Sequence, residues 1–107
     1  MKKISIITVV FNKKIEFEKT LENILSQTHP NLEIIVIDGG SSDGTLDVIK
    51  KNNDKISYWV SEPDEGIYNA MNKGVEIASG EWINFMNAGD FYYNNDTLEN
   101  TFNNLTN

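Results

Sequence analysis

Apolar residues form four short runs along the chain, and each run has the composition of a β-strand. The runs at residues 4–10 and 33–38 are nearly continuous and rich in β-branched residues, which is typical of strands buried on both faces of a sheet. We expect the first run to be the central strand. Two further runs, at residues 56–61 and 82–87, predict a third strand and a buried fourth strand.

The segments between these runs show helical spacing instead. Residues 14–28 and 65–79 carry apolar positions at intervals of three and four, which predicts helices that pack on a sheet by one face. Residues 45–52 predict a shorter helix, and a weaker helical pattern lies within residues 94–107. Gly74 falls on the apolar face of the third helix, where its missing side chain would let the helix approach the sheet closely.

This alternation of strand and helix predicts an α/β fold, with a parallel sheet covered on both faces and right-handed crossovers. A chain of 107 residues is sufficient for one such domain. Three polar side chains follow strand ends: Asn12, Asp38 and Asp90. Open α/β sheets bind ligands at the carboxyl ends of their strands, so this convergence favours a nucleotide site.

Charge and composition narrow the classes of partner. The 16 acidic and 9 basic residues give a formal charge of −7, which argues against nucleic acid or an anionic membrane surface as the main partner. The absence of cysteine excludes disulfides and thiolate metal sites and agrees with a reducing, cytoplasmic setting. No apolar run approaches the roughly 18 residues of a membrane span.

The loops lack the best-known phosphate-binding sequences. Residues 39–44 have the glycine spacing of a Walker loop, but Thr45 stands where the lysine belongs, and the loop after the first strand lacks the dinucleotide-binding glycines. An acidic protein can instead hold a diphosphate through a divalent cation between a carboxylate and the phosphate oxygens. This chemistry gives Asp90 a metal-binding role; the alternative is that residues 87–90 form only a tight turn.

Three blocks of the sequence, residues 6–12, 27–45 and 72–83, resemble the family 2 glycosyltransferases. The resemblance implies a Rossmann-like three-layer sandwich with a mainly parallel sheet, the GT-A type of nucleotide-diphospho-sugar transferase. Residues 1–107 would be the nucleotide-sugar-binding part of such an enzyme, which transfers a sugar to an acceptor hydroxyl with inversion. Residues 62–74 resemble the colanic-acid-type branch, which implies exopolysaccharide, capsule or lipopolysaccharide synthesis.

The resemblance also implies roles for individual residues. Thr8, Asn12 and Asp38 would line the nucleoside pocket, and Asp38 would accept a hydrogen bond from the edge of the base. An ordinary core position is the alternative for Thr8. The residues expected near the donor sugar or diphosphate are Asp64, Asn72 and Lys73. Ordinary polarity on an exposed helix explains Asn72 and Lys73 almost equally well.

The metal motif departs from the family pattern. Where the family usually has Asp-x-Asp-Asp, residues 87–90 are Asn-Ala-Gly-Asp, so Asp90 is the one carboxylate of the motif. The resemblance implies a divalent cation, Mg²⁺ or Mn²⁺, held by Asp90 and by the diphosphate. A metal-independent site is the alternative.

The expected partners follow from the resemblance as well. They are a UDP- or GDP-sugar donor and a saccharide or lipid-linked saccharide acceptor. The expected compartment is the cytoplasm, and a full-length protein could associate peripherally with the inner face of the membrane. No candidate general base follows Asp90, so we expect the catalytic residue and the acceptor-binding part to lie outside these 107 residues, and the fragment alone to be inactive. The alternative is a non-catalytic nucleotide-binding or interaction domain on the same scaffold.

Overall fold

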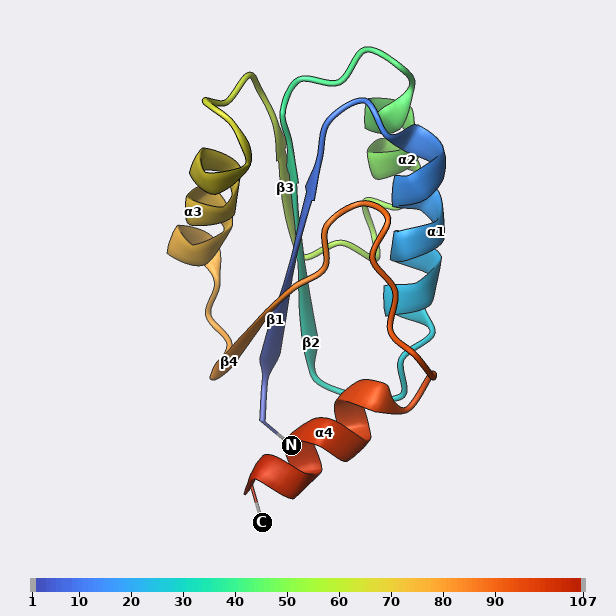
Figure 1. The fold of residues 1–107 in the computed structure, drawn as a ribbon, viewed down its shortest axis with the longest axis vertical. Helices are drawn as coiled ribbons and strands as arrows, with labels where there is room; N and C mark the ends of the chain where they lie inside the picture. The colour runs from blue at the N-terminus through green and yellow to red at the C-terminus, as the bar shows by residue number, and fades with distance from the viewer. Residues whose placement is uncertain (1, 107) are drawn as a thin grey trace.

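The computed structural model describes residues 2–106, with side chains as far as residue 101, and contains one four-stranded sheet (Figure 1). Its strands are β1 (Ile4–Val10), β2 (Leu32–Asp38), β3 (Tyr58–Ser61) and β4 (Trp82–Phe85). The helices are α1 (Lys14–Leu25), α2 (Thr45–Lys51), α3 (Ile67–Ile77) and α4 (Thr97–Thr106). The strands lie in the order β3-β2-β1-β4 and all three neighbouring pairs are parallel, which confirms the predicted α/β class and the central place of β1.

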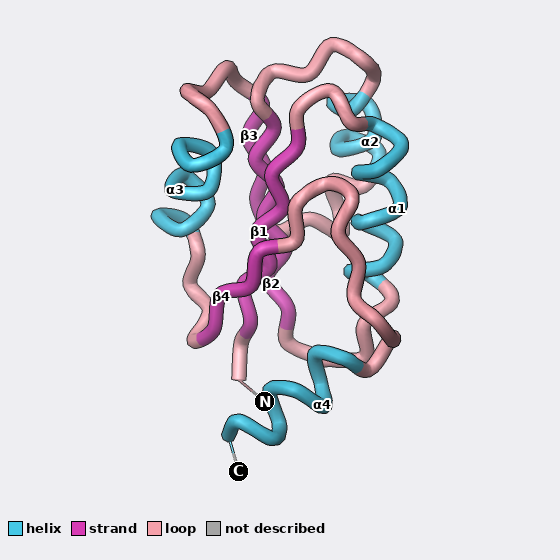
Figure 2. Tube along the Cα trace, in the orientation of Figure 1, coloured by secondary structure: helices cyan, strands magenta, loops and turns pink. Residues whose placement is uncertain are grey.

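The sheet is covered on both faces (Figure 1). Alternate residues of β1 point to opposite faces. Ile6 and Val10 pack in a cluster with α1, α2 and Leu98 of α4, whereas Ile7 and Val9 pack in a second cluster with α3. The loops after β1, β2 and β3 gather at the opposite end of the sheet from α4 (Figure 2). The carboxyl ends of the strands therefore form one edge, as the sequence predicted.

Gly74 sits where α3 crosses β1. A Cβ atom at this position would lie 2.5 Å from Cγ2 of Ile7, which is closer than a real Cβ contact. The predicted close approach of the helix to the sheet is confirmed, and it requires the absence of a side chain at residue 74.

The fourth strand differs from the prediction. Residues 82–87 were expected to form a buried strand, but β4 ends at Phe85, and Trp82 and Ile83 are 36% and 42% exposed. The prediction of burial is wrong because β4 is an edge strand that pairs only with β1 among the described residues. Its apolar composition does not distinguish an edge strand from a central one.

Helix ends differ from the predicted ends by a few residues. Helix α1 stops at Leu25, three residues before the predicted end, because the Thr28 backbone N–H donates to Asn95 O at 2.7 Å and the chain turns toward α4. Helix α3 begins at Ile67, after Gly66 with a positive φ of 116°, and ends where Ala78 adopts a ψ of 132°. No helix among residues 2–106 has the length and apolarity needed to cross a bilayer.

Candidate functional site

Two adjoining hollows lie at the carboxyl edge of the sheet. The β1–β4 hollow has a volume of about 360 Å³ and lies between the end of β1, the start of α3 and residues 87–88 after β4. The β2–β3 hollow has a volume of about 470 Å³ and lies between Phe11, the Gly39–Gly40 backbone and residues 63–66 after β3. Both are lined by Phe11, Asp64 and Gly66. Together they form one continuous surface, which we call the edge site.

Asn12 joins the loops that follow β1 and β2. Its backbone N–H donates to Ser41 Oγ at 2.8 Å, and its side-chain Oδ1 accepts from the Ser42 N–H at 2.8 Å. Its φ of 50° is in the left-handed region, which Asn tolerates better than most residues. Asn12 lines neither hollow of the edge site. In this structure its hydrogen bonds hold the loop after β1 against the loop after β2.

Asp43 makes a second link between the same loops. It accepts hydrogen bonds from Thr45 Oγ1 at 2.6 Å and from the backbone N–H groups of Thr45 and Lys14. The bond from Thr45 Oγ1 is the main reason that the pKa of Asp43 lies below its usual value. Through these hydrogen bonds Asp43 holds the start of α2 against the start of α1.

Asp38 is fully buried at the end of β2. Its Oδ1 accepts from Ser41 Oγ at 2.5 Å, and its Oδ2 accepts from the Ser41 N–H at 3.0 Å and from Ser61 Oγ at 2.7 Å. Both oxygens thus accept hydrogen bonds from the protein itself, from the loop after β2 and from the last residue of β3. The expected hydrogen bond from a base to Asp38 stays a prediction, and it would require at least one of these contacts to be released.

Thr8 lies inside the sheet and lines neither hollow. It is 1% exposed, shares a face of β1 with Ile6 and Val10, and its Oγ1 has no hydrogen-bond partner. This placement agrees with the core alternative for Thr8.

The three residues expected near the donor sugar occupy different surroundings. Asp64 lines both hollows, and its Oδ1 accepts from the Gly66 N–H at 3.0 Å. Asn72 is exposed on α3, and Lys73 forms an ion pair with Glu62 at 3.1 Å. Of the three, only Asp64 reaches the edge site in this arrangement.

The turn after β4 is held by its own side chains and by α1. Asp90 Oδ2 accepts from the Asn87 N–H at 3.0 Å, and Asn87 Oδ1 accepts from the Val9 N–H at 3.3 Å. Buried Thr20 of α1 accepts from the Gly89 N–H and donates to Asp90 O, both at 2.9 Å. Gly89 has a φ of 102°, a conformation that a side chain would strain. The backbone of residue 90 is therefore fixed.

The turn after β4 offers a cation one carboxylate, that of Asp90. Asp90 is exposed, and its Oδ1 makes no hydrogen bond with any described residue. Residues 2–106 contain no group of three or more His, Cys, Asp or Glu side chains arranged for a metal ion. One carboxylate oxygen could bind Mg²⁺ or Mn²⁺ if the ligand and water supplied the other oxygens.

Sequence reasoning missed several residues of the edge site. Phe11, which is 58% exposed, and Lys13 line it, together with the Gly39–Gly40 backbone and Ile67. The available signal was an aromatic residue placed between an apolar strand and a polar loop, where burial in the core is no longer possible.

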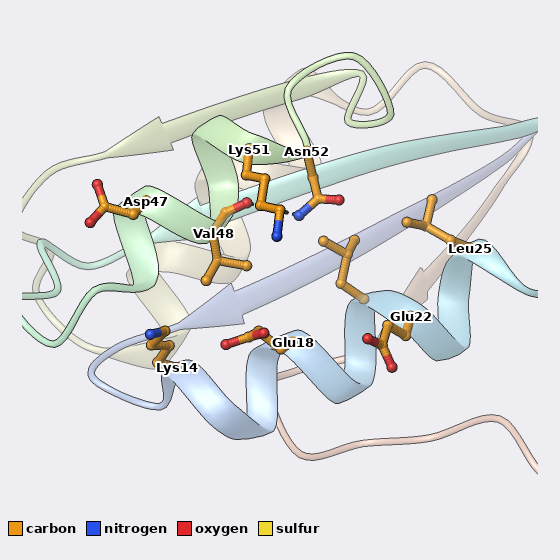
Figure 3. Close-up of a pocket in the computed structure, with 9 residues that line it drawn as sticks. Lys14, Glu18, Glu22, Leu25, Asp47, Val48, Lys51 and Asn52 are labelled. Atoms are coloured by element: carbon orange, nitrogen blue, oxygen red, sulfur yellow. Dashed lines mark hydrogen bonds between the residues drawn. The ribbon is translucent and has the colours of Figure 1, made fainter.

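A separate hollow of about 340 Å³ lies between α1 and α2 (Figure 3). Its rim carries both signs of charge, with Glu18 and Glu22 on α1 and Lys51 on α2, over the apolar Leu21 and Val48. All its lining residues belong to these helices or to Asn52, and no strand end opens into it. It is not part of the edge site.

Comparison with known proteins shows one consistent likeness. Residues 5–107 match the family model described as "Glycosyl transferase family 2". A "PGL/p-HBAD biosynthesis glycosyltransferase" of Mycobacterium bovis is 37% identical over 97 residues, which cover 88% of this chain and 38% of that protein.

Solved structures share the fold. The mannosyltransferase PcManGT from Pyrobaculum calidifontis, in complex with GDP-Man and Mn²⁺, matches with a TM-score of 0.88 and 26% identity over 99% of this chain. S. aureus TarS residues 1–349, in complex with UDP, match with a TM-score of 0.84 and 25% identity over 97% of this chain. The chain spans 33% and 32% of these two proteins, so it corresponds to about a third of their length.

Proposed function

Because the chain belongs to glycosyl transferase family 2, we propose that it binds the nucleotide-sugar donor of a glycosyltransferase at the edge site. The observation that carries the proposal is the convergence of the loops after β1, β2 and β3 and the turn after β4 on two adjoining hollows. The fold is that of the GT-A glycosyltransferases, as the sequence predicted. Residues 1–107 would then be the donor-binding part of a longer catalytic domain.

The two hollows suit different parts of a nucleoside diphosphate. We place the base in the β2–β3 hollow, where the exposed ring of Phe11 offers a stacking surface. We place the diphosphate in the β1–β4 hollow, which contains Lys13 and adjoins the turn that carries Asp90. Lys13 supplies a local positive charge in a chain of formal charge −7.

Asn12 and Asp38 would act on the nucleotide by holding these loops, since their polar atoms bind other residues of the chain. Thr8 would support the sheet from its core. Asn72 and Lys73 remain candidates for the sugar end of the donor, although Lys73 would have to leave its ion pair with Glu62.

A divalent cation would bind between Asp90 and the diphosphate. The free Oδ1 of Asp90 and the presence of Mn²⁺ in the PcManGT complex support this assignment. A bound cation would stabilise the negative charge of the leaving diphosphate. The contribution of the chain itself is to orient the carboxylate, through the Asn87 N–H and through the contacts of Thr20 with the turn.

The donor class and the pathway are part of the same proposal. GDP-Man and UDP in the two similar structures support a GDP- or UDP-sugar. Transfer would proceed with inversion to a saccharide or lipid-linked saccharide, by a general base outside this chain. Exopolysaccharide, capsule or lipopolysaccharide synthesis in the cytoplasm, with peripheral contact at the inner face of the membrane, is the setting we propose. The name of the M. bovis relative, a biosynthesis glycosyltransferase, supports a biosynthetic role.

Calorimetry of UDP binding tests the proposal. UDP should bind more tightly with Mn²⁺ than with a chelator, whereas uridine, which has no phosphate, should show no metal dependence. Asp90→Asn should remove the metal dependence, and Asp54→Asn, an exposed change on the loop before β3, should leave it intact. Equal UDP affinity with and without Mn²⁺ would refute the cation, and the absence of any UDP or GDP binding would refute the donor site itself.

A further inference from the structure

The β2–β3 hollow contains a carboxylate whose position depends on the absence of a neighbouring side chain. Oδ2 of Asp64 lies 2.9 Å from the point where a Cβ atom of Gly39 would be, and Cδ1 of Phe11 lies 3.3 Å from the same point. The Asp64 carboxylate and the Phe11 ring therefore occupy the space above residue 39 that any other residue would fill. Gly39 permits a carboxylate from the loop after β3 to reach over the end of β2.

The two oxygens of Asp64 have different surroundings. Oδ1 accepts a hydrogen bond from the Gly66 N–H at 3.0 Å, whereas Oδ2 has no hydrogen-bond donor among the described residues. Asp38, the carboxylate at the end of β2, is fully buried and uses both oxygens within the protein. Asp64 is thus the carboxylate that keeps an acceptor free for a ligand in this hollow.

A flat ligand group can reach this acceptor. The Phe11 ring is 58% exposed beside the Gly39–Gly40 backbone, so a heterocyclic base can stack on it and turn its edge toward Asp64. A carboxylate accepts hydrogen bonds and donates none, so the facing edge of the base must carry an N–H group. Uracil and guanine carry a hydrogen on the ring nitrogen of that edge. Cytosine and adenine have a bare acceptor nitrogen there, whose lone pair would face the carboxylate, and carry their N–H groups only on the neighbouring amino group.

We propose that Asp64 is the residue that selects the base of the donor, in favour of bases with a ring N–H and against bases with an unprotonated ring nitrogen. This inference rests on the proposed function of the edge site. It assigns to a loop residue, positioned by Gly39, the contact that the sequence assigned to the strand-end Asp38.

UDP and CDP give the sharpest comparison, because they share ribose and diphosphate and differ in the base edge. Calorimetry on the whole chain with Mn²⁺ should show UDP binding at least about tenfold more tightly than CDP, the scale of one hydrogen bond to a charged group. The absolute affinities include the diphosphate contribution, but the ratio of the two does not.

Asp64→Asn should replace the free hydrogen-bond acceptor in the hollow with a donor, with little change of shape. The Gly66 N–H needs an acceptor, so the amide oxygen should take the place of Oδ1 and the NH₂ group should replace Oδ2. UDP should then bind more weakly and CDP more tightly, and their ratio should fall to about one or below. Glu65→Gln is the matched control, because it removes one negative charge next to Asp64 but outside both hollows, and it should leave the ratio unchanged.

Gly39→Ala provides an independent test that leaves Asp64 in place. The new methyl group would lie 2.9 Å from Oδ2 and would displace the carboxylate, so the preference for UDP should decrease. Thermal unfolding of each variant shows whether it is folded. If Asp64→Asn does not fold, the ratio measured for Gly39→Ala decides the matter.

The outcomes separate this inference from the proposed function. A UDP preference that collapses in Asp64→Asn and survives in Glu65→Gln supports the inference. Equal binding of UDP and CDP to the unmodified chain, or an unchanged preference in folded Asp64→Asn, overturns the inference and leaves the donor site standing. Failure of every nucleotide to bind overturns both.

Discussion

Glu33, near the amino-terminal end of strand β2 and away from the edge site, is the residue whose ionisation the fold favours most clearly. Burial alone would raise its pKa, but hydrogen bonds from the Ser79 backbone N–H, from Ser5 Oγ and Ser79 Oγ, and the nearby Lys3, together lower the pKa to about 2. A folded-state pKa below the unfolded value near 4.5 stabilises the protein above that pH. This stabilisation is lost as the pH falls from about 4.5 toward 2.

We predict that Glu33→Gln lowers the free energy of unfolding by about 1–2 kcal/mol at pH 7, after allowance for solvent screening at a partly exposed site. The difference from the unmodified chain should shrink as the pH falls from about 4.5 to 2, because Glu33 takes up its proton in the unfolded chain near pH 4.5 and in the folded chain only near pH 2. Urea unfolding at several pH values measures it. As a control, Glu81→Gln, which breaks only the half-exposed ion pair with Lys2, should lower the free energy of unfolding by less than about 0.5 kcal/mol. A Glu33→Gln effect that stays constant with pH would contradict the role of this carboxylate.

Two buried threonines lead to opposite predictions. Thr8 Oγ1 has no partner, so Thr8→Val should raise the free energy of unfolding by up to about 1 kcal/mol and leave UDP affinity unchanged. Thr20 Oγ1 joins α1 to the turn after β4, so Thr20→Val should lower stability by about 1–3 kcal/mol, because a backbone N–H and a carbonyl lose their partner. Denaturant unfolding of the two variants compares the same chemical change. Equal effects, or weaker UDP binding by Thr8→Val, would contradict this assignment.

The sequence was sufficient to place Asn12 and Asp38 where β1 and β2 end and Asp90 in the turn after β4, because strand ends are predictable from apolar runs. It was not sufficient to show which of their oxygens are free. The partners of Asp38 are Ser41, in the loop after β2, and Ser61, at the end of β3, and their geometry appears only once the sheet is assembled. Residue type alone therefore suggests Asp38 as the ligand contact, whereas the hydrogen bonds favour Asp64.

At the scale of elements, the packing of α3 on β1 depends on one missing side chain. We predict that Gly74→Ala destabilises the protein by about 1–3 kcal/mol, because the new methyl group would lie 2.5 Å from Cγ2 of Ile7. Helix propensity alone predicts the opposite sign, with Ala more stable than Gly by about 1 kcal/mol. Thermal or urea unfolding decides between them. Glu76→Ala, at an exposed position of the same helix, should change stability by less than about 0.5 kcal/mol.

The elements themselves were predictable to different degrees. The buried runs of β1 and β2 were located almost to the residue, since β-branched apolar runs leave few alternatives. The edge position of β4 was not predictable, because exposure of Trp82 and Ile83 depends on which strand lies beside them. Helix ends were displaced where a loop contact, such as that between Thr28 and Asn95, competes with the last turn.

At the scale of the whole molecule, binding of metal and nucleotide at the edge site should together determine how much the folded state is stabilised. The described residues contain no preformed cluster of metal ligands, so Mn²⁺ alone should hardly change the unfolding temperature. Mn²⁺ together with UDP at about 100 times its dissociation constant should add about 2.7 kcal/mol, because ligand binding to the folded state stabilises that state. Differential scanning calorimetry with Mn²⁺, UDP, both, and both plus a chelator measures the coupling. Strong stabilisation by Mn²⁺ alone would contradict a site that is completed by the diphosphate.

The central claim is that a nucleoside diphosphate binds at the carboxyl edge of the sheet, and the location of the bound ligand tests it most directly. Two-dimensional ¹H–¹⁵N NMR of the whole chain, titrated with UDP in the presence of Mg²⁺, reports the backbone amides that the ligand affects. The largest shifts should fall in residues 11–13, 39–41, 64–67 and 87–90, which form or flank the two hollows. The hollow between α1 and α2 should be unaffected. Saturable shifts centred on that hollow or on the amino-terminal end of the sheet, with none at the edge site, would contradict the account.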